Sequence, residues 1–283
     1  MKKYSRLFLL LFVLTSSYSR AALNIFPQGS RAAAMGGIGV VNVDAFAAYN
    51  NQAALGFLTS SEAAVHHENR YFAEELNMSA GAVAIPVPAA GVVALDVCSF
   101  GYSQYRENRV GVAIGKRLAE HISIGAQVCY NHVTAAGYGG TGAVTAELGM
   151  LAEPLENFWL GAHIYNFTYS KFFSHNYNEP LPVLVNVGLG YNVVEYANLF
   201  AAAEVDSKQN VQLKGGFEAT VAKVLALRLG VSAKPAEVYA GFGYTYKRLC
   251  IDAAFSRHET LGYSPQVSLS YSFAKNKKRR NEK

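Results

Sequence analysis

The sequence carries little charge for its length and, beyond its first residues, no long apolar run. Only 16% of the 283 residues are charged, whereas 51% are hydrophobic; a soluble domain usually carries charge on about a quarter of its residues. A membrane-spanning helix needs about eighteen or more apolar residues in succession, so the lack of such a run excludes a helical membrane protein. In lipid, backbone groups are satisfied only in helices and closed sheets. If this apolar chain lies in a membrane, it does so as a closed sheet.

Cysteine is also scarce, with three residues in the chain. Cys98, Cys129 and Cys250 are odd in number and far apart, which excludes a disulfide framework and a zinc site built from closely spaced cysteines. We expect all three to fill small positions on the polar face of strands. The sequence predicts neither a metal site nor a cofactor.

The positive formal charge of +5 lies at the two ends of the chain. Residues 1–21 contain four basic residues and no acidic one, and residues 274–283 carry a net charge of +5. The body between them is therefore mildly acidic, which excludes a basic face for nucleic acid. We expect residues 274–283 to be a solvated basic tail on the periplasmic side; contact with anionic lipid headgroups or peptidoglycan is the alternative.

Catalytic patterns do not gather at one place in the sequence. The stretch 137–142 matches the letters of the dinucleotide fingerprint, but that fingerprint requires a helix after it, and here strands are expected on both sides. His66 and His67 are adjacent, so on a strand they point to opposite faces and do not share a metal. No serine–histidine–aspartate set or carboxylate pair recurs at one rim. The sequence argues against an enzyme.

The first 21 residues have the order of a secretory signal peptide. Lys2, Lys3 and Arg6 form a basic start, residues 7–14 form an apolar centre, and small residues flank position 20 before the expected cleavage site. This order is typical of an exported protein whose leader is removed. We therefore predict residues 1–21 to be a signal peptide.

From residue 62 to residue 273 the chain repeats one unit, in which about ten residues alternate between apolar and small or polar and a short turn follows. Val185, Val187 and Leu189 lie on one side of such a run, with Asn186 and Gly188 on the other. Strand side chains alternate between faces, so each run has one apolar and one polar side. Repetition at this length predicts an all-β, antiparallel transmembrane β-barrel over residues 62–273.

The pattern predicts about fourteen strands. They are expected at 62–70, 76–86, 91–102, 108–117, 121–133, 143–152, 157–168, 182–192, 197–206, 209–219, 223–233, 236–246, 248–258 and 264–273. Tight connections alternate with a set that is mostly longer and more polar or aromatic, such as 135–142 and 169–181. Outer-membrane barrels have short periplasmic turns and longer external loops, so this alternation predicts the cell outer membrane as the location and places the first strand running outward.

The alternation also assigns side chains to the two faces of the wall. Lipid is expected to meet apolar residues such as Leu95, Val128 and Leu213. The interior is expected to contain a network of charged residues, since charge on the lipid face costs about 2–4 kcal/mol at the midplane for Lys or Arg. Its predicted members are Asp96, Glu147, His163, Glu204, Lys214, Glu218, Arg228 and Asp252.

Residues 22–61 do not alternate, and here the chain resembles a known family. Ordered positions of this segment are Gly29, Arg31, Ala32, Met35, Gly36, Gly37, Asp44, Tyr49, Asn51, Ala53, Ala54 and Leu55. They resemble the start of the FadL-like outer-membrane family, which includes long-chain fatty-acid transporters and the PorV and PorQ accessory barrels of type IX secretion. One departure is Gln52, where the family has a proline; we expect a looser turn there. The resemblance covers this segment closely and the barrel in strand pattern alone.

The resemblance implies that residues 22–61 fold inside the barrel as an N-terminal hatch. Glycines at 36 and 37 suit close backbone approach and positive φ. Arg31 would then be a buried cation in need of acidic partners, which Glu147, Glu218, Asp96, Glu204 or Asp252 could supply. We expect this charge cluster to have a structural role in fixing the hatch rather than a role in conduction.

The segment 169–181 is the longest predicted external loop and the most aromatic. Tyr169, Phe172, Phe173 and Tyr177 suit contact with an apolar ligand or a partner protein, and an interfacial aromatic belt is the alternative.

Two functions follow from the resemblance. The first is passage of small hydrophobic molecules past the hatch, and the second is a plugged scaffold or accessory of a protein secretion system. The expected partners are outer-membrane lipid and either a hydrophobic small molecule or a secretion-system protein, with no nucleic acid and a monomeric barrel. The two readings differ in the interior: an open apolar pocket favours passage, whereas a solidly packed lumen favours a scaffold.

Overall fold

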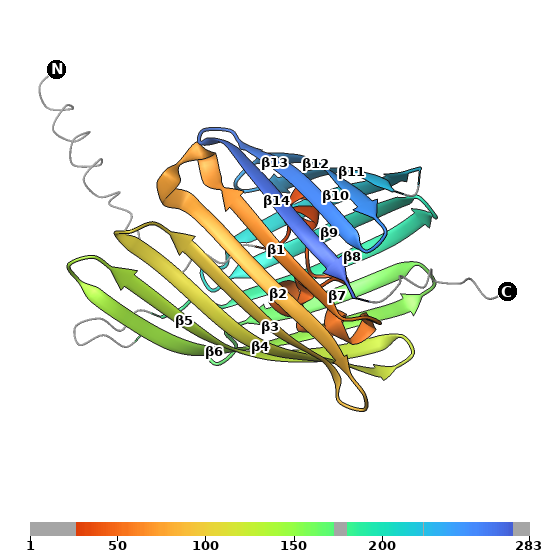
Figure 1. Ribbon diagram of the computed structural model, residues 1–283, viewed down its shortest axis with the longest axis horizontal. Helices are drawn as coiled ribbons and strands as arrows, with labels where there is room; N and C mark the ends of the chain where they lie inside the picture. The colour runs from red at the N-terminus through yellow and green to blue at the C-terminus, as the bar shows by residue number, and fades with distance from the viewer. Residues whose placement is uncertain (1–26, 173–179, 223, 274–283) are drawn as a thin grey trace, which may run out of the picture.

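The computed structural model describes residues 27–172, 180–222 and 224–273. In these residues fourteen antiparallel strands close into one barrel, in which each strand pairs with its neighbours in the sequence (Figure 1). Closure occurs between β1 (Glu62–Asn69) and β14 (Gly262–Ser272), where Val65 is opposite Leu269. The other strands are β2 (Asn77–Val87), β3 (Gly91–Gly101), β4 (Tyr105–Ala119), β5 (Ile122–Ala135), β6 (Gly139–Leu155), β7 (Phe158–Tyr165), β8 (Leu184–Val194), β9 (Ala197–Asp206), β10 (Val211–Val221), β11 (Leu225–Ala233), β12 (Glu237–Tyr246) and β13 (Leu249–His258).

The predicted barrel is confirmed, and each predicted strand is present with small shifts at its ends. The largest shift is at β6, which begins at Gly139 rather than at residue 143. Gly139 pairs with Ala135, so the expected loop over 135–142 is wrong and is replaced by a tight turn at residues 136–138. The letters that match the dinucleotide fingerprint therefore lie in a hairpin. Tyr138 at its tip is 94% exposed.

The two faces of the wall differ as the alternation predicts. Apolar side chains cover the outside, where Leu95, Val128 and Leu213 are about half exposed, at 49%, 58% and 58%. Inward positions on β1 to β4 are mostly small, as at Ala64 and Ala82, which are buried. An apolar outer surface of this extent on a closed barrel suits contact with lipid.

The barrel has two ends that differ in their connections. One end, here called the loop end, carries residues 166–172 and 180–183 and the short 3₁₀ helices η2 (Arg70–Phe72) and η3 (Glu74–Leu76). The other end, here called the turn end, carries tight connections such as 88–90 and 247–248. β14 finishes at the turn end.

The N-terminal segment, residues 27–61, lies inside the barrel (Figure 1). It contains the short helices α2 (Ser30–Ala34) and α3 (Ala47–Asn50) and the 3₁₀ helix η1 (Gln52–Phe57). α2 contacts β11 to β14, whereas η1 contacts β3 to β6. Ile38 and Leu55 are fully buried among the alanines of the inner wall. Small inward residues thus leave the space that this segment fills.

Among the described residues, no helix has the length and apolar character needed to cross a bilayer.

Candidate functional site

The segment is first fixed by hydrogen bonds within itself. Gln28 and Asn50 exchange two bonds: the Gln28 backbone N–H donates to Asn50 Oδ1, and Asn50 Nδ2 donates to the Gln28 carbonyl, both at 2.9 Å. Asn51 Nδ2 donates to the Val40 carbonyl at 2.6 Å, while Asn51 Oδ1 accepts the Ala53 N–H at the start of η1. The two helical parts therefore form one folded unit, in which Asn51 acts as an N-cap.

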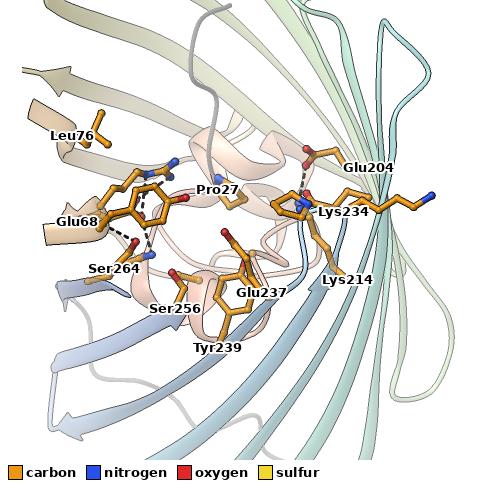
Figure 2. A pocket seen from close by; sticks show the side chains of 18 of the residues that line it. Pro27, Glu68, Leu76, Glu204, Lys214, Lys234, Glu237, Tyr239, Ser256 and Ser264 are labelled. Atoms are coloured by element: carbon orange, nitrogen blue, oxygen red, sulfur yellow. Dashed lines mark hydrogen bonds and ion pairs between the residues drawn. The ribbon is translucent and has the colours of Figure 1, made fainter. Parts of the chain in front are cut away.

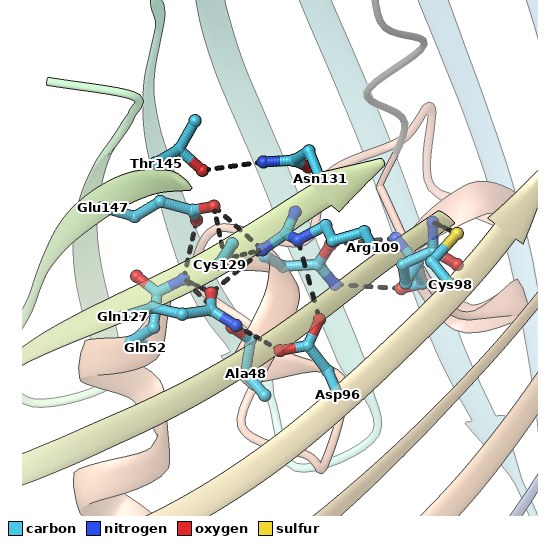
Figure 3. A network of polar contacts seen from close by, with 12 residues as sticks. Ala48, Gln52, Asp96, Cys98, Arg109, Gln127, Cys129, Asn131, Thr145 and Glu147 are labelled. Atoms are coloured by element: carbon cyan, nitrogen blue, oxygen red, sulfur yellow. Dashed lines mark hydrogen bonds and ion pairs between the residues drawn. The ribbon is translucent and has the colours of Figure 1, made fainter. Parts of the chain in front are cut away.

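A buried polar network joins this unit to the wall at β3 to β6 (Figure 3). Its centre is Arg109 on β4, whose Nη2 donates to Glu147 Oε1 at 2.8 Å and to Gln127 Oε1 at 3.0 Å. Arg109 Nε lies 3.7 Å from Asp96 Oδ1. His163 Nε2 lies 2.9 Å from the second oxygen of Glu147. The network therefore joins side chains from five consecutive strands, since His163 lies on β7.

Two residues of the N-terminal segment complete the network. Gln52 Nε2 donates to Gln127 Oε1 at 2.7 Å and to Glu147 Oε2 at 3.0 Å, and Gln52 is fully buried. The Tyr49 ring lies under the Arg109 guanidinium, 3.9 Å from ring centre to Cζ, a cation–π geometry. The looser turn expected at Gln52 is wrong, because its side chain fixes η1 to the wall.

A second ionic cluster lies near the turn end, on β10, β11 and β13. Arg31 donates to both oxygens of Glu218, from Nε at 3.0 Å and from Nη2 at 2.8 Å. This bidentate pair is the strong form of an arginine–carboxylate contact. Arg228 then joins Glu218 to Asp252, with both contacts at 2.6 Å. Glu218 is therefore the partner of Arg31 among the five acids that the sequence offered.

The pKa values of two groups in the segment, Arg31 and Asp44, are both raised, but for different reasons. The Glu218 carboxylate raises the pKa of the Arg31 guanidinium above its ordinary value. Burial raises the pKa of the Asp44 carboxyl, while Arg31 nearby lowers it. Asp44 Oδ1 makes no hydrogen bond in the described part of the chain. Arg31 is therefore positively charged, at the end of the segment that faces the turn end of the barrel.

Glycines allow α2 and the turn after it to approach the wall. Gly36 has φ +75°, and a Cβ on it would lie 2.7 Å from the Val231 carbonyl oxygen. A Cβ on Gly230 would lie 2.1 Å from the Gly36 nitrogen. Both contacts are with backbone atoms, so the segment and β11 touch without intervening side chains. Met35 beside them is fully buried.

The N-terminal segment separates two cavities. The loop-end cavity has a volume of about 1180 Å³ and touches Ala33, Gly36 and Gly37. The turn-end cavity has a volume of about 1170 Å³ and touches Gly29, Ser30 and Arg31. Residues 29–37 therefore lie between the two spaces, on the side of the barrel formed by β9 to β13.

The remaining predicted residues lie around these spaces. Lys214 Nζ donates to Glu204 Oε2 at 2.9 Å on the wall of the loop-end cavity, while Gly29, Asp44, Glu218, Arg228 and Asp252 line the turn-end cavity. The predicted charge network is therefore three separate groups. Asp96, Glu147 and His163 join Arg109, Glu218 and Arg228 join Asp252, and Glu204 joins Lys214.

The aromatic loop near residue 170 is described in part. Tyr169 is 61% exposed, and Phe172 is partly buried. Lys171 and Pro180 form an isolated bridge that closes the base of the loop. Phe173 and Tyr177 lie outside the described residues, as do residues 1–21 of the predicted signal peptide and the basic tail 274–283.

Several solved structures have an arrangement similar to that of this barrel. The model is similar to the CymD monoaromatic hydrocarbon channel, with a TM-score of 0.65 and 13% identity over 89% of this chain and 98% of that one. It is also similar to a Pseudomonas aeruginosa FadL homologue and to the Pseudomonas putida toluene transporter TodX, each with a TM-score of 0.63 and 13% identity, covering 89% of this chain and 99% of the other.

The barrel has the FadL fold. No family model and no curated protein matches the sequence. The likeness to FadL-fold structures therefore stands on three-dimensional arrangement alone, at an identity too low to carry a substrate across.

Within the FadL fold, sequence reasoning missed Arg109. Val110 and Val112 point outward on β4, so the alternation already placed Arg109 inside. The two buried acids Asp96 and Glu147 also required a cation. These two signals together would have identified it.

Within residues 27–172, 180–222 and 224–273, no group of three histidine, cysteine or acidic side chains is arranged to hold a metal ion. Cys129 is buried beside Arg109, whose Nη2 lies 3.1 Å from its sulfur, and it is not in a disulfide.

Proposed function

We propose that the protein is an outer-membrane channel for the passage of small hydrophobic molecules, with residues 27–61 acting as its hatch. The observation that carries this proposal is the separation of two cavities by residues 29–37, with an open space on either side. A molecule that entered at one end would meet a barrier of about one turn of helix on the β9 to β13 side. Two of the similar structures are a toluene transporter and a monoaromatic hydrocarbon channel, which supports the same class of function.

The orientation follows from the connections. The loop end would face outward and the turn end the periplasm, as in outer-membrane barrels. The loop-end cavity is then the entrance, and the turn-end cavity is the exit. The cavities are open on both sides, but their linings are mixed and not the apolar lining expected for passage. The open space still favours a channel over a plugged scaffold of a secretion system, whose lumen was expected to be solidly packed.

The two halves of the hatch have different attachments. η1 is fixed by Gln52 within a fully buried network, whereas α2 is attached by the Arg31–Glu218 pair, in which the Arg31 side chain is 32% exposed. Water that reaches the turn-end cavity screens this pair. We infer that α2 and the turn at Gly36 move during passage, while η1 stays in place.

The substitution Arg31→Ala tests the hatch. Loss of the ion pair frees α2, so we expect a rise in ion conductance across planar bilayers and faster proteolysis between residues 27 and 43. Cells that express the Arg31→Ala variant should also take up labelled toluene faster than cells that express the unaltered protein. The matched control is Arg248→Ala, since Arg248 lines the same cavity and forms no ion pair among the described residues.

The proposal also requires passage by the unaltered protein. Cells that express it should take up toluene faster than cells that lack it. Equal uptake in those two strains, or an Arg31→Ala variant with unchanged conductance and proteolysis, would contradict a hatch-gated channel.

A further inference from the structure

The loop-end cavity has a mixed lining, in which polar residues outnumber apolar ones. Among the described residues, its lining includes five acidic and three basic side chains and four tyrosines. Fully apolar side chains such as Leu76 and Phe100 are a minority, and the tyrosine rings add apolar surface beside the charged groups. A site for a plain hydrocarbon would be lined mostly by apolar side chains, because unpaired polar groups lose hydrogen bonds when a hydrocarbon displaces their water.

One corner of this cavity concentrates hydrogen-bond acceptors. Glu237 and Tyr239 lie on β12, Ser256 on β13 and Ser264 on β14, and Figure 2 shows them around the same space as Glu68 on β1. The Tyr239 hydroxyl donates to Glu237. Within the described ranges, Glu237 forms no ion pair, whereas Glu204 across the cavity pairs with Lys214. Glu237 therefore retains acceptor capacity toward the cavity.

The backbone at the edge of this corner is unusual. Tyr71 and Phe72 follow each other with φ of 56° and 55°, in the left-handed region that non-glycine residues seldom adopt. The Tyr71 N–H donates to Ser264 Oγ at 3.1 Å, and its ring stands edge-on to His258 with 6.0 Å between centres. Successive strained residues of this kind are found at ligand sites more often than elsewhere. Here they place the Tyr71 ring beside the acceptors.

The rest of the cavity disfavours a negative ligand. Its acidic side chains outnumber the basic ones, and Lys214 is occupied by Glu204. An anionic molecule would meet an excess of negative charge, because the lining has five acidic and three basic side chains. A neutral molecule with hydroxyl groups would instead donate to the carboxylates and present its ring to the tyrosines, whose faces accept apolar rings.

We propose that the corner formed by Glu237, Tyr239, Ser256, Ser264 and Tyr71 binds a neutral compound that combines an apolar ring with several hydroxyl groups, such as an aryl glycoside. This inference rests on the proposed function and narrows it, since the molecule bound at the channel entrance is then an apolar ring that carries hydroxyl groups rather than a plain hydrocarbon. Carboxylate acceptors select the hydroxyl groups, and the tyrosine rings contact the apolar part.

Binding of a matched set of probes tests the inference. The full-length protein in lipid nanodiscs is titrated by calorimetry with p-nitrophenyl glucoside, p-nitrotoluene, p-nitrobenzoate and p-nitrobenzylamine. We expect the glucoside to bind more tightly than the other three. Glu237→Gln should weaken glucoside binding by about tenfold or more, because it removes a charged hydrogen-bond acceptor. Tyr71→Leu should also weaken it, because it removes the ring that contacts the apolar part of the glucoside.

The controls carry the same substitutions outside the cavity. Glu156→Gln lies in a turn-end connection, and Tyr246→Leu lies on the exposed outer face of β12; both should bind the glucoside as the unaltered protein does. Tighter binding of nitrotoluene, nitrobenzoate or nitrobenzylamine than of the glucoside would overturn the inference. So would unchanged glucoside binding in both cavity variants.

The two proposals fail in distinguishable ways. If the glucoside does not bind but toluene uptake still depends on the Arg31 contact, the site assignment is wrong and the channel stands. If the glucoside binds at this corner while neither toluene nor glucoside is taken up by expressing cells, the site stands as a binding site and the channel function fails.

Discussion

Gln52 connects the N-terminal segment to the barrel wall through one amide group. Its Nε2 donates to Gln127, to Glu147 and to the Ala48 carbonyl of its own segment. A proline at this position would make none of these side-chain contacts. The family resemblance led us to expect a loosened turn. Glutamine at this position instead adds hydrogen bonds to the wall, whereas a proline would only restrict the backbone.

The substitution Gln52→Leu tests this attachment at the residue scale. It removes two hydrogen bonds to the wall, one of them to the buried Glu147 carboxylate, at a cost of about 2 kcal/mol. That cost corresponds to an increase of about thirtyfold in the population with η1 released, and proteolysis of the segment should accelerate accordingly. Limited proteolysis in detergent measures the rate.

Gln104→Leu is the matched control for this variant, since Gln104 is exposed in the connection between β3 and β4. Its proteolysis rate should stay within error of the unaltered protein. An unchanged rate in Gln52→Leu as well would mean that packing of Leu55 and the alanines alone fixes η1.

The residue that a side chain contacts was harder to predict than the face of the strand on which that side chain lies. The family resemblance implied that Arg31 lies inside the barrel, and the period of two placed five acids in the interior. The choice of Glu218 depends on how the segment lies against β10, 187 residues further along the chain. Arg109 was missed although its face was readable, because the alternation gives a direction and not a partner. Contacts across several strands depend on the register of each one.

At the scale of elements, α2 and β11 form a contact in which glycine is required on both sides. Gly36 and Gly230 bring two backbones together, and a Cβ on Gly230 would also lie 2.5 Å from the Met35 carbonyl carbon. Neither backbone can yield like the end of a flexible side chain. The position of α2 is thus set by the wall as much as by the Arg31 ion pair.

The substitution Gly230→Ala should displace α2 while the barrel still closes. The added methyl group overlaps the backbone at residues 35 and 36, and overpacking of this kind costs about 1–3 kcal/mol. We expect higher ion conductance and faster proteolysis of the segment, with unchanged heat-dependent gel mobility of the barrel. Trp159 is the single tryptophan, and its ring lies 5.0 Å from the ring of Phe57 in η1. Its fluorescence should therefore change as well when the displacement of α2 spreads through the segment to η1.

Gly215→Ala on the neighbouring strand is the control. A Cβ there would lie 3.4 Å from a Val231 methyl group, an ordinary contact, so conductance should not change. Equal conductance for Gly230→Ala and the unaltered protein would show that the wall adapts to α2 rather than positioning it.

The strands were predictable because alternation is a local pattern in the sequence. The start of β6 was missed where that pattern is absent. β9 has the predicted bounds, since alternation continues to both of its ends. β6 starts four residues early because Gly139, Gly140 and Gly142 have no side chains to alternate. Their pairing with β5 became visible only with the partner strand in place. The fold of the N-terminal segment was available from the family resemblance and not from periodicity, since its helices have four to six residues.

At the scale of the whole molecule, the barrel wall separates a polar, charged interior from an apolar outer surface. Adjacent residues on β11 show this division: the Arg228 side chain is 5% exposed and paired with two acids inside, while Leu229 is 60% exposed on the outside. The wall is one residue thick, so a single step along the strand leads from an ionic cluster to the apolar outer surface.

The substitution Leu229→Arg measures that division directly. Leu229 is at the middle of β11, so its side chain is expected near the bilayer midplane, where an arginine on the lipid face costs about 2–4 kcal/mol. Unfolding by urea from lipid vesicles should show this loss of free energy, while Leu229→Ala should lose clearly less. In detergent micelles, whose interface bends around a charged side chain, the difference between the two variants should shrink. A Leu229→Arg protein as stable in vesicles as Leu229→Ala would mean that this face of β11 does not meet lipid, and the membrane location of the barrel would fall with it.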